Sequence, residues 1–254
     1  MKANDIDRWL LNHIFDRNRV FKIAIRNCYC EYARWFGRES GHFLTRALEA
    51  GPNEAAMRDV LREHYSAHSI QSFNETIGSD IHHPYGDKYF LPWESDRLRP
   101  LNKFLLSHKI GPTPETRLPI ILGRLNGVVN SIKKNGFKQV WRKAGYIRLI
   151  RIVDIDNKEL YMVRDGNHRL AGLSFLKFTH AMAGLETRHW ENSVPFRFVA
   201  RITGRKSPSI VADPTVRESE VEEWPHVRSG VVTPDDAIKF FRAKFSEAFK
   251  EDTQ

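Results

Sequence analysis

The chain has 254 residues, of which 41% are hydrophobic and 28% are charged. These proportions indicate a globular protein with a buried core and argue against a mostly disordered or fibrous chain. Lys and Arg outnumber Asp and Glu by 40 to 31, which gives a formal charge of +9. We therefore expect an anionic partner. The charge alone does not distinguish between nucleic acid, a membrane surface and phosphorylated small molecules.

No apolar run approaches the roughly 18–20 residues that a membrane helix needs. The first residues, MKANDIDRWL, lack the apolar centre of a secretory signal. We therefore expect a cytoplasmic protein without a transmembrane segment, and the basic charge leaves peripheral membrane attachment open. The 2 cysteines, Cys28 and Cys30, fit neither a disulfide framework nor a complete zinc set, so we interpret them as buried thiols.

The pattern predicts an α+β protein in four consecutive parts. These are a helical N-terminal extension (1–80), an ordered loop region (81–112), a core (113–203) and a tail with a helix packed on that core (204–254). The first forty residues alternate apolar and basic positions, which predicts one or two amphipathic helices. Candidates for their buried faces are Ile6, Leu10, Ile14, Val20, Ile23 and Tyr32. Interspersed acidic residues favour packing on the main domain over binding to a membrane surface.

Residues 42–78 also look helical, with a break at Gly51-Pro52-Asn53 and a new helix after Asn53 as its cap. The following stretch, 81–119, is rich in His, Pro, Gly, Trp and Tyr and has no sustained periodicity, so we predict an ordered loop that lines a pocket. Within it Trp93 and Glu94 are candidate substrate contacts, with a buried anchor as the equal alternative for Trp93. His82, His83 and Asp87 can bind metals, but a third ligand at a regular spacing is missing, which favours a structural loop over zinc.

The core begins with a helix predicted over 115–135 that ends at Asn135-Gly136. A hairpin follows, from strands over 146–153 and 159–163 with a turn at Asp156-Asn157. Apolar spacing predicts a helix over 168–178, and residues 194–202 fit a strand. Thr233 and Pro234 mark the start of the last helix.

Between the second hairpin strand and the next helix lies Arg164-Asp165-Gly166-Asn167-His168-Arg169. A strand that runs through Asp-Gly directly into a helix gathers free backbone N–H groups, the positive end of the helix and cationic side chains. Gly166 permits close approach, and His168 can donate a hydrogen bond or a proton. Arg169 can grip two oxygens, and Asp165 could bind Mg²⁺ or position a nucleophile. The turn therefore predicts a phosphate site, although the string alone fits an ordinary turn equally well.

The element order and this turn resemble the ParB/sulfiredoxin superfamily over roughly ninety residues. Ser131-Ile-Lys-Lys-Asn-Gly looks like its "S-I-x-x-x-G" helix end, and residues 165–169 look like its nucleotide-phosphate box. The resemblance implies a small mixed sheet with helices, and a bound nucleotide contacted by Ser131, Gly166, Asn167, His168 and Arg169. Members include CTP-binding partitioning proteins, sulfiredoxins and free-serine kinases, so membership leaves the reaction open.

Departures from the pattern narrow these options. Asn167 stands where a sulfiredoxin has its catalytic cysteine, and the region after the box lacks a helix-turn-helix DNA reader. The free-serine kinases resemble the chain better, because they use a D-G-H-H-R box and a catalytic glutamate at the start of the helix before the sheet. Glu115 stands in a comparable place next to Arg117. The resemblance implies that Glu115 is a base, whereas its position alone favours a simple helix-dipole acid.

The tail segment Glu223-Trp-Pro-His-Val-Arg-Ser-Gly resembles uncharacterised ParB-like proteins of cell-surface polysaccharide gene sets. Trp224 and Pro225 are interpreted as a pin on the core, and Arg228 as a candidate that reaches the phosphate pocket.

Our leading hypothesis is an ATP-dependent kinase that phosphorylates a hydroxyl of a small metabolite or a glycan precursor. Asp165 would bind Mg²⁺, and Glu115, Asp165 and His168 would have catalytic roles. The candidate substrate contacts are Trp93, Glu94, Arg117 and Arg228. A nucleotide-binding regulator without transfer chemistry and a nucleic-acid-binding protein or nuclease are the alternatives.

Overall fold

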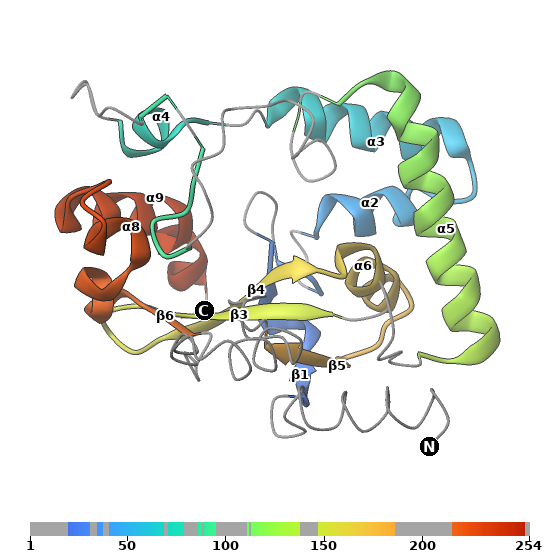
Figure 1. Ribbon diagram of the computed structural model, residues 1–254. Helices are drawn as coiled ribbons and strands as arrows, with labels where there is room; N and C mark the ends of the chain where they lie inside the picture. The colour runs from blue at the N-terminus through green and yellow to red at the C-terminus, as the bar shows by residue number, and fades with distance from the viewer. Residues whose placement is uncertain are drawn as a thin grey trace, which may run out of the picture.

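The computed structural model describes residues 20–30, 35–37, 41–68, 71–78, 86–87, 89–94, 111, 113–137, 147–185 and 215–251. Within these ranges the chain is a mixed α+β protein with a 6-stranded mixed sheet and helices packed around it (Figure 1). The strand order is β1-β5-β3-β4-β2, and β6 pairs with β3. The predicted α+β class is confirmed at this level.

The sheet is assembled from strands that are far apart in the sequence. They are β1 (Val20–Ala24), β2 (Cys28–Tyr29), β3 (Arg148–Val153), β4 (Glu159–Asp165), β5 (His180–Leu185) and β6 (Thr215–Arg217). β1 pairs antiparallel with β5, while β2 runs parallel to β4. On its other edge β3 pairs in parallel with β5 at one end and with β6 at the other.

The hairpin predicted in the core is confirmed as β3 and β4. Its turn is held by the backbone N–H of Lys158, which donates to Asp154 Oδ1 at 2.7 Å, and Asn157 adopts φ 62°, a conformation that asparagine tolerates. The pairing runs in strict register from Val153–Glu159 back to Leu149–Val163 and then shifts, so that Arg148 lies opposite Asp165. Arg164 is therefore an extra residue in a β-bulge.

Helices form where the sequence carries local start and stop signals. Their bounds are α2 Phe43–Glu49, α3 Glu54–Ala67, α4 Phe73–Ile77, α5 Leu118–Asn135, α6 Asn167–Phe175, α8 Pro225–Arg228 and α9 Pro234–Glu251, with short 3-10 helices η2 Ile25–Asn27, η3 Glu115–Arg117 and η5 Glu218–Glu223. Asn53 caps α3 through Oδ1, which accepts from Ala55 N at 2.9 Å. Thr233 Oγ1 accepts from Asp236 N at 3.2 Å and caps α9. The predicted starts of both helices are confirmed.

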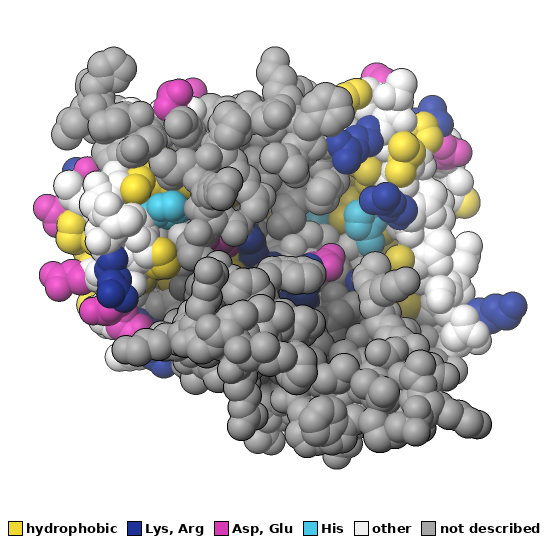
Figure 2. All heavy atoms as spheres, viewed as in Figure 1, with side chains coloured by type: hydrophobic (Ala, Val, Ile, Leu, Met, Phe, Trp, Pro, Cys, Tyr) yellow, Lys and Arg dark blue, Asp and Glu magenta, His cyan; other side chains and the backbone are white. Residues whose placement is uncertain are grey.

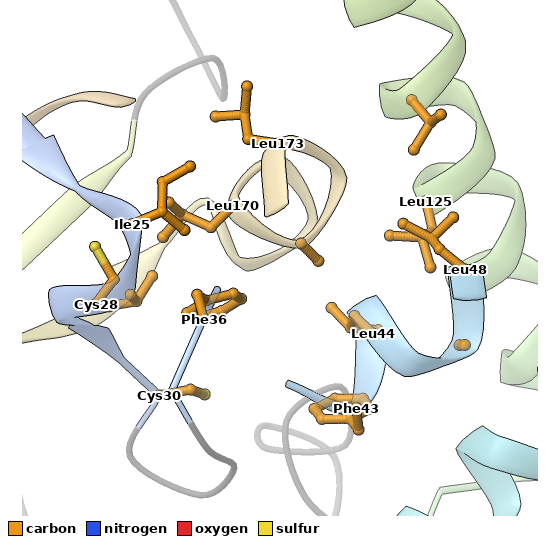
Figure 3. Close-up of a cluster of buried hydrophobic side chains, with 14 of the residues drawn as sticks. Ile25, Cys28, Cys30, Phe36, Phe43, Leu44, Leu48, Leu125, Leu170 and Leu173 are labelled. Carbon is orange, nitrogen blue, oxygen red and sulfur yellow. The ribbon is translucent and has the colours of Figure 1, made fainter. Parts of the chain in front are cut away.

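Two hydrophobic clusters hold the described elements together. One joins α2, α3, α5 and α6 to the sheet through residues such as Phe36, Leu44, Leu125 and Leu170, which converge in Figure 3. The other joins α4, α8, α9 and the 89–94 segment to the sheet. Along β3 the side chains alternate between them, because successive strand residues point to opposite faces: Leu149 belongs to the first cluster and Ile150 to the second.

The helical prediction for the start of the chain is wrong over its described part. Val20 and Ile23 lie in strand β1, paired with Gly184 and Ala181 of β5, because a distant partner strand overrides a local helical pattern. The helix predicted over 168–178 ends at Phe175. Lys177 adopts φ 62°, and Phe178, the last residue of the predicted helix, is 44% exposed.

Several predictions fall outside the described residues. These are the helix over 1–19, Tyr32, His82, His83 and the strand over 194–202.

Cys28 and Cys30 are both buried and free, as predicted. Burial raises the pKa of the Cys28 thiol to about 12, which keeps it protonated and unreactive near neutral pH. In the part of the chain that the structure describes, no helix combines the length and apolar character needed to cross a membrane.

Candidate functional site

The predicted turn joins the central hairpin to α6. Asp165 ends β4, Gly166 adopts a left-handed conformation (φ 99°, ψ 13°), and Asn167 begins the helix. The Gly166 carbonyl accepts from the backbone N–H groups of Arg169 and Leu170, each at 2.9 Å. A Cβ on Gly166 would lie 3.0 Å from Cα of Ile147. Both its backbone angle and its tight packing therefore require glycine here.

The N-terminus of α6 has no side chain that caps it, because its N-cap residue is Gly166. The first N–H groups of a helix have no partner within the helix and carry the positive end of its dipole. An anion placed before α6 would therefore meet both.

Asp165 is held by two donors. Its Oδ1 accepts from the backbone N–H of Gly166 at 2.8 Å, and its Oδ2 accepts from Nη2 of Arg148 at 3.1 Å. The bulge makes this second contact possible. A strict continuation of the hairpin register would place Arg148 opposite Arg164, and like charges directly opposite each other destabilise a sheet. The bulge replaces that repulsion with an Arg–Asp ion pair.

Arg169 is half-buried and forms no hydrogen bond or ion pair within the described chain. Burial lowers the pKa of its guanidinium, and the nearby Asp165 carboxylate offsets part of that effect. Arginine nevertheless stays charged in proteins. A partly desolvated cation that no carboxylate contacts directly is costly unless an anion binds it.

Two further polar side chains of the turn are partly buried. Asn167 Oδ1 is enclosed and accepts no hydrogen bond from any described group. His168, the next residue, is half-buried as well. A ligand with both donor and anionic groups would satisfy this acceptor and the neighbouring Arg169.

Glu115, the predicted base, is bound by a residue of α3. Its two carboxylate oxygens accept from Nε and Nη2 of Arg62 at 2.8 and 2.9 Å, which ties η3 to α3. The hydrogen bonds from Arg62 lower the pKa of Glu115. The role of Glu115 as a base stays a prediction.

Trp93 is a buried anchor, which was the alternative to its predicted contact with substrate. Its side chain is fully buried, and its ring meets Trp224 edge-on at 5.4 Å and Phe241 at 5.8 Å between centroids. Glu94 pairs with the bulged Arg164 at 2.8 Å, and the two side chains are 16% and 24% exposed. This ion pair links the 89–94 segment to β4 just before the turn.

The remaining predicted contacts are spread over other elements. Ser131 is exposed on α5, one residue before Ile132, which packs near Gly172 of α6. Arg117 lies near Tyr65 of α3, and Arg228 pairs with Glu223 at 3.7 Å on α8. Figure 1 places α8 and α6 on opposite sides of the view. The described contacts thus bring together residues 165–169 but do not join Ser131, Arg117 or Arg228 to them.

Arg148 and Arg62 were not predicted from the sequence. The alternating apolar pattern of the hairpin hid Arg148, although counting outward from the turn would have placed it near the Asp-Gly step. Only the bulge determines which of its neighbours it meets. Arg62 lies 53 residues from Glu115, and no local pattern reports such a pair.

Figure 2, drawn from the same side as Figure 1, shows the surface hollowed near its centre, with basic and acidic side chains side by side in the hollow. Within the described residues, no group of three or more His, Cys, Asp or Glu side chains could hold a metal ion on its own. Comparison with protein-family models, curated proteins and solved structures found no match in any of the three.

Proposed function

We propose that the 165–169 turn binds the phosphates of a nucleotide in a ParB/sulfiredoxin-like module, and that the chain is an ATP-dependent kinase. Its acceptor would be a hydroxyl of a small metabolite or of a cell-surface glycan precursor. The observation that carries the proposal is the half-buried Arg169, without an ion pair in the described chain, at the open N-terminus of α6. Such a cation and helix end together favour a phosphate group.

The residues present fit a nucleotide and Mg²⁺. Asn167 Oδ1 is an enclosed acceptor without a described donor, which a hydroxyl or amino group of a nucleotide would satisfy. Mg²⁺ is commonly held by one or two carboxylates together with substrate phosphates, so Asp165 alone can serve as its protein ligand. When bound, the ion would neutralise phosphate charge.

The chain's own residues would then act mainly by positioning. Gly166 turns the chain from β4 into α6, Arg169 grips the phosphate oxygens, and the first N–H groups of α6 stabilise the negative charge. His168 could donate a further hydrogen bond or a proton at the same place. Phosphoryl transfer needs chiefly such positioning and charge stabilisation, together with an acceptor for the hydroxyl proton.

The second candidate is a nucleotide-binding regulator without transfer chemistry. The pairing of Glu115 with Arg62 favours it, because a carboxylate whose pKa is lowered by two hydrogen bonds is a weaker base. Under this alternative the same turn binds a nucleotide and no product forms.

The proposed function is tested by nucleotide consumption. The protein would be incubated with ATP, Mg²⁺ and single acceptors, namely hydroxyl amino acids, sugars and nucleotide sugars, while ADP is measured. We expect acceptor-dependent ADP release that Glu115→Gln lowers by roughly 100-fold or more, the range for loss of a general base, while ATP binding is retained.

The matched control is Glu54→Gln, which removes an exposed glutamate paired with Arg58 of the same α3 and should leave turnover unchanged. ATP binding without product from any acceptor would replace the kinase with the regulator. Loss of binding in Glu115→Gln would contradict the role of Glu115 as base.

A further inference from the structure

The turn contains a second cation whose partner is the site's own carboxylate. Arg148 begins β3 and reaches Asp165 at 3.1 Å, and its side chain is still 37% exposed. Arg148 therefore contacts Asp165, which directly precedes the N-cap of α6, while part of its side chain is exposed to solvent. Arg169 follows Asp165 in the chain, and the charge of the same carboxylate raises the pKa of its guanidinium.

The charges around the turn are unbalanced in favour of an anion. The carboxylate of Asp165 pairs with the guanidinium of Arg148 and acts on that of Arg169 only through its charge. The N-terminus of α6 adds about half a positive charge. A group that carries at least two negative charges, such as a terminal phosphate or a pyrophosphate, would be attracted to these cationic groups more strongly than a single carboxylate.

A second Arg–acid pair on the same two strands provides a comparison for the Arg148–Asp165 pair. Arg151 of β3 pairs with Glu159 of β4, with Nε to Oε2 at 2.9 Å, in the regular part of the register. The Arg148 pair alone depends on the bulge, and the bulge sets it beside Gly166. Bulges of this kind often redirect side chains at functional sites.

We propose that Arg148 is a phosphate-binding residue of this site, held by Asp165 until a polyphosphate group arrives and then shared with that group. The proposal rests on the proposed function, because it assigns a further residue to the same turn. It identifies the ligand group by its chemistry, as a phosphate or polyphosphate with two or more negative charges. Asp165 thereby has two opposite effects on ligand binding. With Mg²⁺ it would hold the ion that neutralises the phosphate, and without Mg²⁺ it competes with the ligand for Arg148.

The test measures pyrophosphate affinity by titration calorimetry without Mg²⁺, using the full-length chain and three variants. Arg148→Ala should weaken binding roughly tenfold to hundredfold, the effect of losing one charge-assisted hydrogen-bonding group. Arg151→Ala removes the matched arginine of β3 and should bind like the wild type. Asp165→Asn keeps an acceptor for Gly166 N–H but removes the competing charge, so it should bind pyrophosphate more tightly.

The opposite changes in pyrophosphate affinity expected for Arg148→Ala and Asp165→Asn distinguish a binding role of this pair from a purely structural one. If the pair served only to hold the strands, Arg148→Ala and Asp165→Asn would weaken binding together, with equal losses of thermal stability, and the proposal would be wrong. Unchanged affinity in Arg148→Ala would overturn it as well. If Arg148→Ala loses thermal stability, Arg148→Lys, which keeps the charge, should recover stability and only part of the affinity.

ATP, ADP, CTP and GTP are titrated in parallel, so that the two proposals can fail separately. Pyrophosphate binding that depends on Arg148, without binding of any nucleotide, would contradict the proposed function and support the role of Arg148. Nucleotide binding that depends on Arg169 but not on Arg148 would do the reverse. Absence of binding by every probe would overturn both.

Discussion

At the scale of single residues, Gly166 carries the strongest conformational requirement in the turn. Its φ of 99° belongs to the left-handed region, and a Cβ there would meet Ile147 at 3.0 Å. Gly78, the C-cap of α4, also has positive φ, at 61°, but a Cβ there would have nothing within 4 Å. Substitution at Gly78 would therefore introduce backbone strain alone, whereas substitution at Gly166 would add crowding to that strain.

We expect Gly166→Ala to lower the free energy of unfolding by about 2 kcal/mol or more, because left-handed strain of about 1–2 kcal/mol adds to crowding against β3. Gly78→Ala should show only the strain. Chemical denaturation of both variants measures the difference. Equal losses at the two positions would show that Ile147 does not restrict the turn.

At the scale of elements, the 89–94 segment illustrates how an aromatic residue in an irregular stretch can be misread. Trp93 follows a proline and precedes a glutamate, a context that fits ligand stacking and core packing equally well. α9 decides between them, since Phe240, Phe241 and Phe245 from one face of that helix surround the indole ring. The helix was predicted from its cap, but its partner was not.

We expect Trp93→Ala to cost about 3–5 kcal/mol of stability, as for other large-to-small changes in a core. Trp93→Phe should recover most of that loss. Thermal unfolding and nucleotide titration of both proteins provide the measurement. A stable Trp93→Ala protein with weakened acceptor use would instead support the substrate contact that the burial of Trp93 opposes.

At the scale of the whole molecule, the sequence predicted the elements whose signals are local. Asn53 and Thr233 mark helix starts, Asn135-Gly136 a helix end, and Asp156-Asn157 a hairpin turn, and each is confirmed. The strands β1, β2, β5 and β6 were missed, because they are short and each becomes a strand only by pairing with a distant one.

The candidate site divides in the same way. The strand–Gly–helix arrangement of 165–169 was readable, because it lies within one stretch of chain. The Arg148 contact depends on a bulge, and the Arg62–Glu115 pair depends on the packing of α3 beside η3. Neither has a signal in the residues that surround it.

The most direct test of the account is a thermal-shift titration of the wild type, Arg169→Ala and Arg151→Ala with ATP, ADP, CTP and GTP, with and without Mg²⁺. A ligand at 100 times its dissociation constant stabilises the native state by about 2.7 kcal/mol. We predict stabilisation of the wild type and of Arg151→Ala by at least one nucleotide, and its loss in Arg169→Ala. Failure of all four nucleotides to stabilise the wild type, or equal stabilisation of Arg169→Ala, would contradict a phosphate site at this turn.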